Sequence, residues 1–146
     1  MEILNQIIHN KCIVVPIVLW CLVQVSKFFT ELIVNKRVDF KRLVGAGGMP
    51  SSHSAIVCCL ASCIGKEYGF DSGNFALALI FAFVVMYDAA GVRRAAGKQA
   101  GILNKILDTP GMSTLEVQEK LIEALGHTPI QVFIGALIGF LVGVLV

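Results

Sequence analysis

The stretch FALALIFAFVVMY, residues 75–87, decides the fold of this chain. It contains no charged residue, and together with the residues up to Arg93 it approaches the ~20 apolar residues that a helix needs to cross about 30 Å of hydrocarbon. Asp88 follows it directly, and Arg93 and Arg94 come a few residues later. We therefore expect a membrane-spanning helix over Phe75–Arg93 that ends in a charged cluster.

The composition also favours a bilayer as the solvent. Of the 146 residues, 56% are hydrophobic and 15% are charged, whereas soluble domains have about 45–50% and 25%. This length predicts a single domain over residues 1–146. The net charge of +2 is too small, and the basic residues too scattered, to indicate a nucleic-acid partner.

Three more segments are apolar enough to be expected as membrane spans: Cys12–Val34, Ser51–Tyr68 and Thr128–Val146. The second is the most polar, because it begins with two serines and a histidine that fit better against protein than against lipid. The sequence therefore predicts an all-α fold, a polytopic membrane bundle of about four transmembrane helices. Its five cysteines fall in apolar stretches and are expected to act as small hydrophobic residues.

The segments between the spans have their own signals. Turn-forming residues at 69–74 predict a tight hairpin, and residues 94–107 could continue as helix. Ser113 and Glu116 have the spacing of a capping box, which predicts a short amphipathic helix on the cytoplasmic side. The apolar stripe of that helix would consist of Leu115, Leu121, Ile122 and Leu125, and Gly126 would end it.

The basic residues predict the orientation in the membrane, because short cytoplasmic loops carry most of the lysine and arginine. Nine of the twelve fall in the loop after the first span, at the end of the third span or in the segment after it, all on one side. We expect this side to be cytoplasmic, in a multi-pass protein of the cell membrane. The nine residues are Lys36, Arg37, Lys41, Arg42, Arg93, Arg94, Lys98, Lys105 and Lys120.

This topology would bring four separated polar clusters to the same membrane face. Ser51, Ser52 and His53 open the second span, where unpaired N–H groups of a helix N-terminus can hold an anion. The alternative is that a serine simply caps the helix. Lys27 lies inside the first span, either as part of the site or as a snorkelling side chain.

The other two clusters follow the third span and open the fourth. Arg93 and Arg94 suit phosphate binding, with Asp88 as an expected ion-pair partner. His127 could attack phosphorus as a nucleophile. Thr128 and Gln131 after it fit a capping box, and Gly135, Gly139 and Gly143 predict a close helix-packing seam that could also support a homodimer.

These motifs resemble the divergent branch of the type 2 phosphatidic acid phosphatase (PAP2) superfamily, which is related to the vanadium haloperoxidases. The resemblance covers nearly the whole chain. Its most specific parts are GGMPSSHS at 47–54, DAAGVRR at 88–94 and LGHTP at 125–129 with the glycine-rich span that follows.

The resemblance implies a metal-independent hydrolase of phosphoric monoesters or diphosphates that uses no cofactor. His127 looks like the nucleophile that forms a phosphohistidine, and His53 resembles the general acid. Ser51, the N–H of Ser52, Lys27 and one or both of Arg93 and Arg94 resemble the phosphate ligands. The implied substrate is a polyprenyl or glycerolipid phosphate, with the membrane lipids around it as partners.

The sequence departs from the superfamily pattern at several positions. Ser52 stands where glycine is common, Lys27 is far from the second motif, and 32 residues separate Arg94 from His127. Gln131 occupies the position of a carboxylate that would stabilise a charged histidine. Neutralising such a carboxylate costs about 10⁴-fold in a catalytic triad, so we predict slow turnover. The alternatives are a binding or transport protein for phosphorylated lipids, or a small structural membrane protein.

Overall fold

In the computed structural model the regular secondary structure of the described residues, which are 1–36, 48–108, 121 and 126–146, is entirely helical. The all-α prediction is therefore confirmed for these residues. Most of the basic loop (residues 37–47) lies outside the described residues. So does nearly all of the segment 113–125, where the amphipathic helix is expected. The helices are α1 (Glu2–His9), α2 (Lys11–Asn35), α3 (Ser52–Tyr68), α4 (Gly73–Ala90), α5 (Val92–Leu107) and α6 (Pro129–Leu145).

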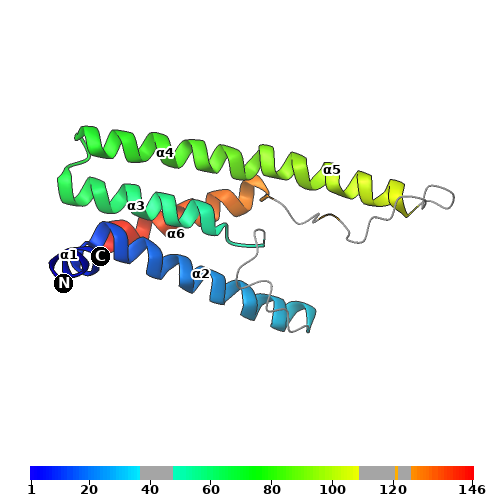
Figure 1. Cartoon of the computed structure of the whole chain (residues 1–146), viewed down its shortest axis with the longest axis horizontal. Coiled ribbons are helices and arrows are strands. Elements are labelled where there is room, and N and C mark those ends of the chain that lie inside the picture. The colour runs from blue at the N-terminus through cyan, green and yellow to red at the C-terminus, as the bar shows by residue number, and fades with distance from the viewer. Residues whose placement is uncertain (37–47, 109–120, 122–125) are drawn as a thin grey trace.

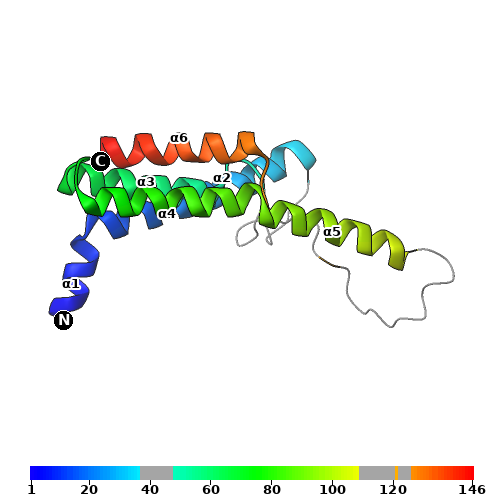
Figure 2. The same ribbon diagram turned by 90° about the horizontal axis from the view of Figure 1, so that it is seen from above.

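Helix α3 is the centre of the bundle and contacts α2, α4 and α6. Helices α2, α3 and α4 lie side by side in Figure 1. The view from above in Figure 2 shows that α6 lies against α3 on one face of this row. Helix α5 continues the line of α4 beyond the bundle, and α1 projects from the opposite end. The predicted hairpin is present, since Ser72 caps α4 by accepting a hydrogen bond from the Phe75 N–H.

Two helical stretches in the described part of the chain are long and apolar enough to cross a membrane, Lys11–Ile33 and Gly73–Leu107. The second contains α4 and α5 together. Helix α6 is apolar but has 17 residues, and α3, also of 17 residues, carries buried serines. The helices expected at all four positions are present, but the structure supports a membrane span for only two of them.

The core is narrow and consists of small side chains. Leu19 and Val23 of α2 pack against Ala55, Cys59 and Cys63 of α3. The large apolar side chains point outward instead, as a bilayer would require. The five cysteines are free thiols, and Cys59 and Cys63 act as the small hydrophobic residues that the sequence predicts.

The glycines of α6 let this helix lie directly against the backbone of α3. A Cβ atom at Gly135 would collide with the Ser51 carbonyl and one at Gly139 with the Ala55 carbonyl, while one at Gly143 would lie 2.6 Å from the Cys59 carbonyl oxygen. The contacts advance together along both helices, so α3 and α6 run parallel. The predicted packing seam is therefore confirmed, and it is used inside the chain.

A single added methyl group should test the seam. Gly139→Ala should reduce the free energy of unfolding by about 1–3 kcal/mol, the usual cost of overpacking, because the Ala55 backbone cannot yield. Gly73→Ala is the matched control, since a Cβ there meets nothing within 4 Å. Thermal unfolding in detergent measures both, and equal melting temperatures for the two variants would contradict this packing.

Candidate active site

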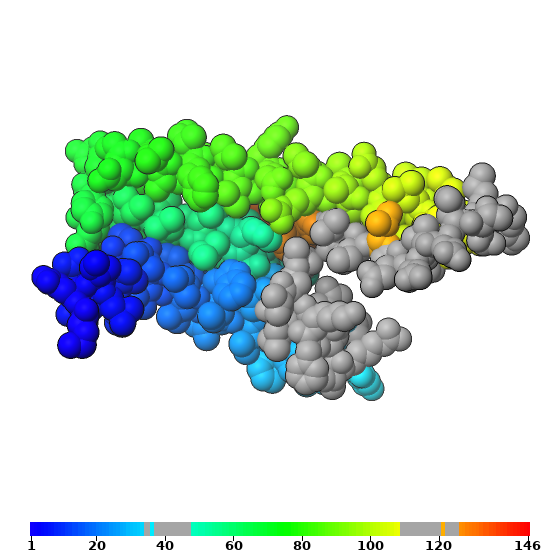
Figure 3. All heavy atoms as spheres, viewed as in Figure 1, coloured from blue at the N-terminus to red at the C-terminus, as the bar shows by residue number. Residues whose placement is uncertain are grey.

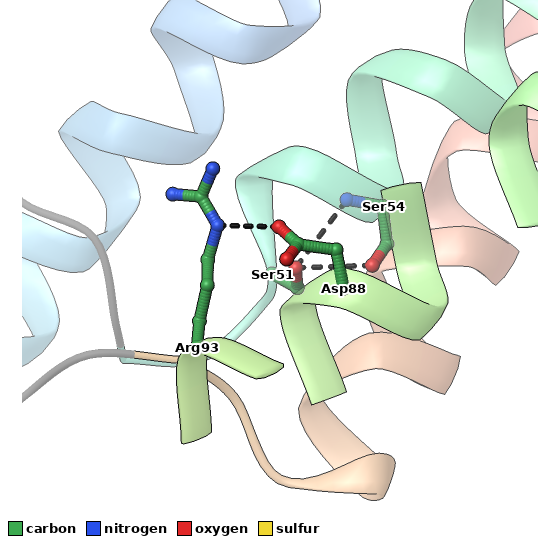
Figure 4. A network of polar contacts seen from close by, with 4 residues as sticks. All are labelled: Ser51, Ser54, Asp88 and Arg93. Atoms are coloured by element: carbon green, nitrogen blue, oxygen red, sulfur yellow. Dashed lines mark hydrogen bonds and ion pairs between the residues drawn. The ribbon is translucent and has the colours of Figure 1, made fainter. Parts of the chain in front are cut away.

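The N-terminus of α3 is built by serines. Ser51 is the N-cap, and its hydroxyl oxygen accepts hydrogen bonds from the Ser54 N–H at 3.3 Å and the Ser54 hydroxyl at 3.0 Å (Figure 4). The Ser51 N–H donates to the Gln131 carbonyl of α6 at 3.0 Å. The capping alternative for Ser51 is thus observed. Ser54, which sequence reasoning did not single out, could have been found from its position three residues after the cap.

Lys27 reaches this helix end from α2. Its ammonium donates a hydrogen bond to the Ser52 hydroxyl at 3.0 Å, and the two side chains are 4% and 2% exposed. The snorkelling alternative is wrong, because a snorkelling lysine would carry its charge to water. The ammonium instead adds a buried positive charge beside the positively polarised N-terminus of α3.

His127 lies just before α6 and is held from two sides. Its backbone N–H donates to the Ala89 carbonyl of α4 at 2.9 Å. Gly126 precedes it with φ +87°, a conformation that suits glycine, and packs against the backbone of Arg94 so closely that a Cβ would collide. The His127 side chain is 2% exposed. The loop before α6 is therefore fixed against the end of α4 and the start of α5.

The two predicted catalytic histidines meet. The ring centroids of His53 and His127 are 5.9 Å apart, with an angle of 64° between the ring planes. Among the described residues, neither ring nitrogen of His127 nor the Nδ1 atom of His53 has a hydrogen-bond partner, although all three atoms are buried. Buried polar atoms normally have partners, so the pair is suited to a polar group placed between or beside the rings.

His127 is held in its neutral form. Burial lowers the pKa of its imidazole to about 4, and the positive charges of Lys27 and His53 act in the same direction. The Gln131 side chain and the Gly48 backbone are close enough to oppose this shift, but neither makes a hydrogen bond of good geometry to the ring. A neutral imidazole has a free lone pair, which nucleophilic attack requires.

Gln131 caps α6. Its side-chain oxygen accepts a hydrogen bond from the Thr128 N–H at 2.9 Å, and its N–H donates to the Thr128 hydroxyl at 3.4 Å. This is the capping box predicted from the sequence, with Pro129 in the first turn. An orienting role of Gln131 toward His127 stays a prediction.

The charged cluster after α4 has a defined pairing. The Arg93 Nε donates to an Asp88 carboxylate oxygen at 2.6 Å, and both side chains are partly exposed (Figure 4). Both residues, like Lys27, lie within electrostatic range of the His53 ring. Arg94 lies in the first turn of α5, with its backbone against Gly126. The structure thus brings the four polar clusters to one end of the bundle.

Comparison with known proteins identifies the family of this chain. A profile of the divergent PAP2 family matches residues 8–142. The chain is 44% identical over 129 residues to the uncharacterized membrane protein YuiD of Bacillus subtilis (strain 168), a match that covers 81% of this chain and 82% of the relative. No solved structure matches. The profile spans the two histidines, Lys27 and Arg93 alike, and this membrane protein therefore belongs to the divergent PAP2 family.

Proposed function

We propose that this protein is a membrane phosphatase that hydrolyses a lipid phosphate through a phosphohistidine intermediate. The observation that carries the proposal is the 5.9 Å approach of the His53 and His127 rings, whose buried nitrogens lack partners among the described residues. The N-terminus of α3 and the Lys27 ammonium make the same end of the bundle favourable for a phosphoryl group. Family membership is consistent with this chemistry.

In the first step a nitrogen of neutral His127 attacks phosphorus. The new N–P bond forms as the bond between phosphorus and the leaving oxygen breaks, and protonated His53 gives its proton to that oxygen. The lipid alcohol then leaves. Lys27 and Arg93 stabilise the charge on the transferred phosphoryl group. We favour Arg93 over Arg94 for this role because Arg93 lies within electrostatic range of His53.

In the second step His53, now neutral, accepts a proton from water. The water oxygen attacks phosphorus, the N–P bond breaks, and inorganic phosphate leaves while His127 returns to its neutral form. The N–H groups at the start of α3 and the Ser51 hydroxyl bind the phosphoryl oxygens through both steps. The proton balance closes, because His53 ends the cycle in the protonated form in which it began.

A lipid substrate follows from the setting of the site. The polar cluster lies where apolar helices end, which suits a molecule with a charged head and an apolar tail.

We place the site on the cytoplasmic face of a multi-pass protein, with both termini outside, because the basic residues fall mainly on this side. A homodimer would need a surface other than the glycine seam, which α3 occupies.

A second candidate function has its own support. Gln131 offers no negative charge to stabilise a charged His127, so the protein could bind or move phosphorylated lipids without hydrolysing them. Recovery of bound lipid phosphate with the purified protein, together with no release of inorganic phosphate, would favour this function over the phosphatase.

Purified protein should release phosphate from a panel of polyprenyl and glycerolipid phosphates in the presence of a metal chelator. His127→Ala and His53→Ala should each reduce the rate at least 100-fold, in line with the usual contribution of an acid or base. His9→Ala is the matched control, because His9 is exposed in α1 at the other end of the bundle. Equal activity of all three variants would refute the assignment of the site.

Gln131→Glu should raise the turnover number by roughly two to four orders of magnitude, by analogy with the carboxylate of a catalytic triad. Glutamate keeps the acceptor of the capping box and adds the charge that a phosphohistidine lacks here. Gln131→Met, which provides neither, should show no gain. The expected role of residue 131 is wrong if steady-state kinetics show the same turnover number for Gln131→Glu as for the unchanged protein.

The buried neutral His127 should make the fold sensitive to acid. The pKa of His127 is 6.5 in the unfolded chain and about 4 in the folded protein. Above pH 6.5 the residue is neutral in both states, so its burial does not reduce the free energy of unfolding through protonation. As the pH falls below 6.5 the unfolded chain takes up the proton first, so stability decreases and levels off near pH 4, by about 3 kcal/mol in total. Chemical denaturation between pH 7.5 and 4.5 measures this loss. His127→Gln should lose less stability, and identical slopes would contradict a neutral His127.

A further inference from the structure

An apolar cavity lies at the end of the bundle opposite the candidate active site. Its volume is about 560 Å³, and it is floored by Leu60 and Ile64 of α3. Leu77, Ala78 and Phe81 of α4 form one wall, and Cys12 of α2 belongs to the other. Helices α2 and α4 do not contact one another, so α3 is visible between them on the face drawn in Figure 3.

The floor of this cavity lies on the same face of α3 as His53. A helix turns about 100° per residue, so Leu60 and Ile64 lie within roughly 20° of His53 on the surface of α3. Leu60 follows His53 by about 10 Å along the helix axis, and Tyr68 at the far end of the cavity by about 22 Å. One face of α3 therefore runs from the general acid to the cavity floor.

The wall formed by α4 shows the same relationship. Leu77, Phe81, Val84 and Asp88 fall within about 60° of one another around α4. Leu77 and Phe81 line the cavity, while Asp88 pairs with Arg93 near His53. On both α3 and α4, residues that line the cavity thus lie on the same side as residues of the charged end of the bundle. This side faces the space between α2 and α4, which we call the groove.

A second, smaller cavity serves as a comparison. It has a volume of about 250 Å³, lies between α4 and α6, and includes Cys58, Leu79, Leu137 and Phe140. Cys58 is about 140° away from His53 around α3, and Leu79 is about 160° away from Leu77 around α4. The residues that line this second cavity therefore lie on other sides of α3 and α4 than His53 and Leu77, and the cavity does not lead to His53. We call it the second groove.

From this geometry we infer that the groove between α2 and α4 binds the apolar tail of the substrate, with the head at His53 and the tail over Leu60, Ile64 and Phe81. The inference rests on the proposed phosphatase. In-line transfer puts the leaving oxygen opposite the attacking His127 nitrogen and next to the general acid. The tail is attached to that oxygen, so it leaves the site on the His53 side, where the α3 face leads to the larger cavity.

The groove predicts a preference for long tails. A tail must extend about 10 Å beyond the phosphate before it reaches Leu60, and about 16 Å before it reaches Ile64. Each added methylene that becomes buried should raise the affinity about fourfold, so affinity should rise steeply once the tail enters the cavity. Shorter esters should be bound through the head alone.

A photo-crosslinking experiment tests the position of the tail without requiring turnover. The probe is a long-chain alkylphosphonate with a diazirine at the end of the tail, added to the full chain in detergent with and without excess unlabelled alkyl phosphate. Mass spectrometry should find displaceable labels on Leu60, Ile64, Leu77 or Phe81. Labels on Cys58, Leu79, Leu137 or Phe140, or no displaceable label, would overturn the inference.

A pair of substitutions gives the kinetic counterpart. Leu60→Trp narrows the groove and should raise KM for a long-chain lipid phosphate at least tenfold, while kcat/KM for a short water-soluble phosphate ester stays the same. Leu79→Trp in the second groove is the matched control and should change neither. An unchanged KM for the long-chain substrate in Leu60→Trp, or a raised KM in Leu79→Trp instead, would overturn the inference. Displaceable labelling without hydrolysis would leave the tail groove standing and refute only the phosphatase.

Discussion

The parallel contact between α3 and α6 is the constraint on which the rest of the structure depends. Glycine at three successive turns of α6 allows backbone contact with Ser51, Ala55 and Cys59. Because the helices run parallel, both N-termini lie at the same end of the bundle. Parallel helix dipoles repel each other at close range, so this arrangement concentrates positive potential where His53 and His127 meet. The Lys27 ammonium increases it further.

This concentration of positive potential is the physical basis for the anion site that we propose. Burial and the neighbouring charges hold His127 neutral, and the same charges would be relieved by a phosphoryl group. The loop before α6 contributes by fixing His127 to the Ala89 carbonyl, so the imidazole is positioned by the backbone of a third helix. The site is thus a product of helix packing more than of any single motif.

Much of the site could be predicted from the sequence because its signals are local. The polar clusters stand at the ends of apolar runs, the capping box of Thr128 and Gln131 is a short pattern, and the glycine spacing indicates close packing. The sequence predicts four membrane spans, of which the structure supports two. Composition alone does not show whether one side of a helix contacts lipid or protein, and α3 buries its serines against protein. Helix α1, the Ala89 contact with His127 and the groove over Leu60 depend on tertiary geometry, which short sequence patterns do not contain.

The central claim is that one oxyanion contacts both His53 and His127, and histidine NMR tests it most directly. The chain has three histidines, and His9 in α1 serves as an internal reference at the other end of the bundle. With ¹⁵N-labelled histidine side chains and added orthovanadate as a phosphate analogue, the resonances of His53 and His127 should shift together and saturate at the same concentration, while His9 stays unchanged. Shifts in only one of the two rings, or in neither, would contradict the account.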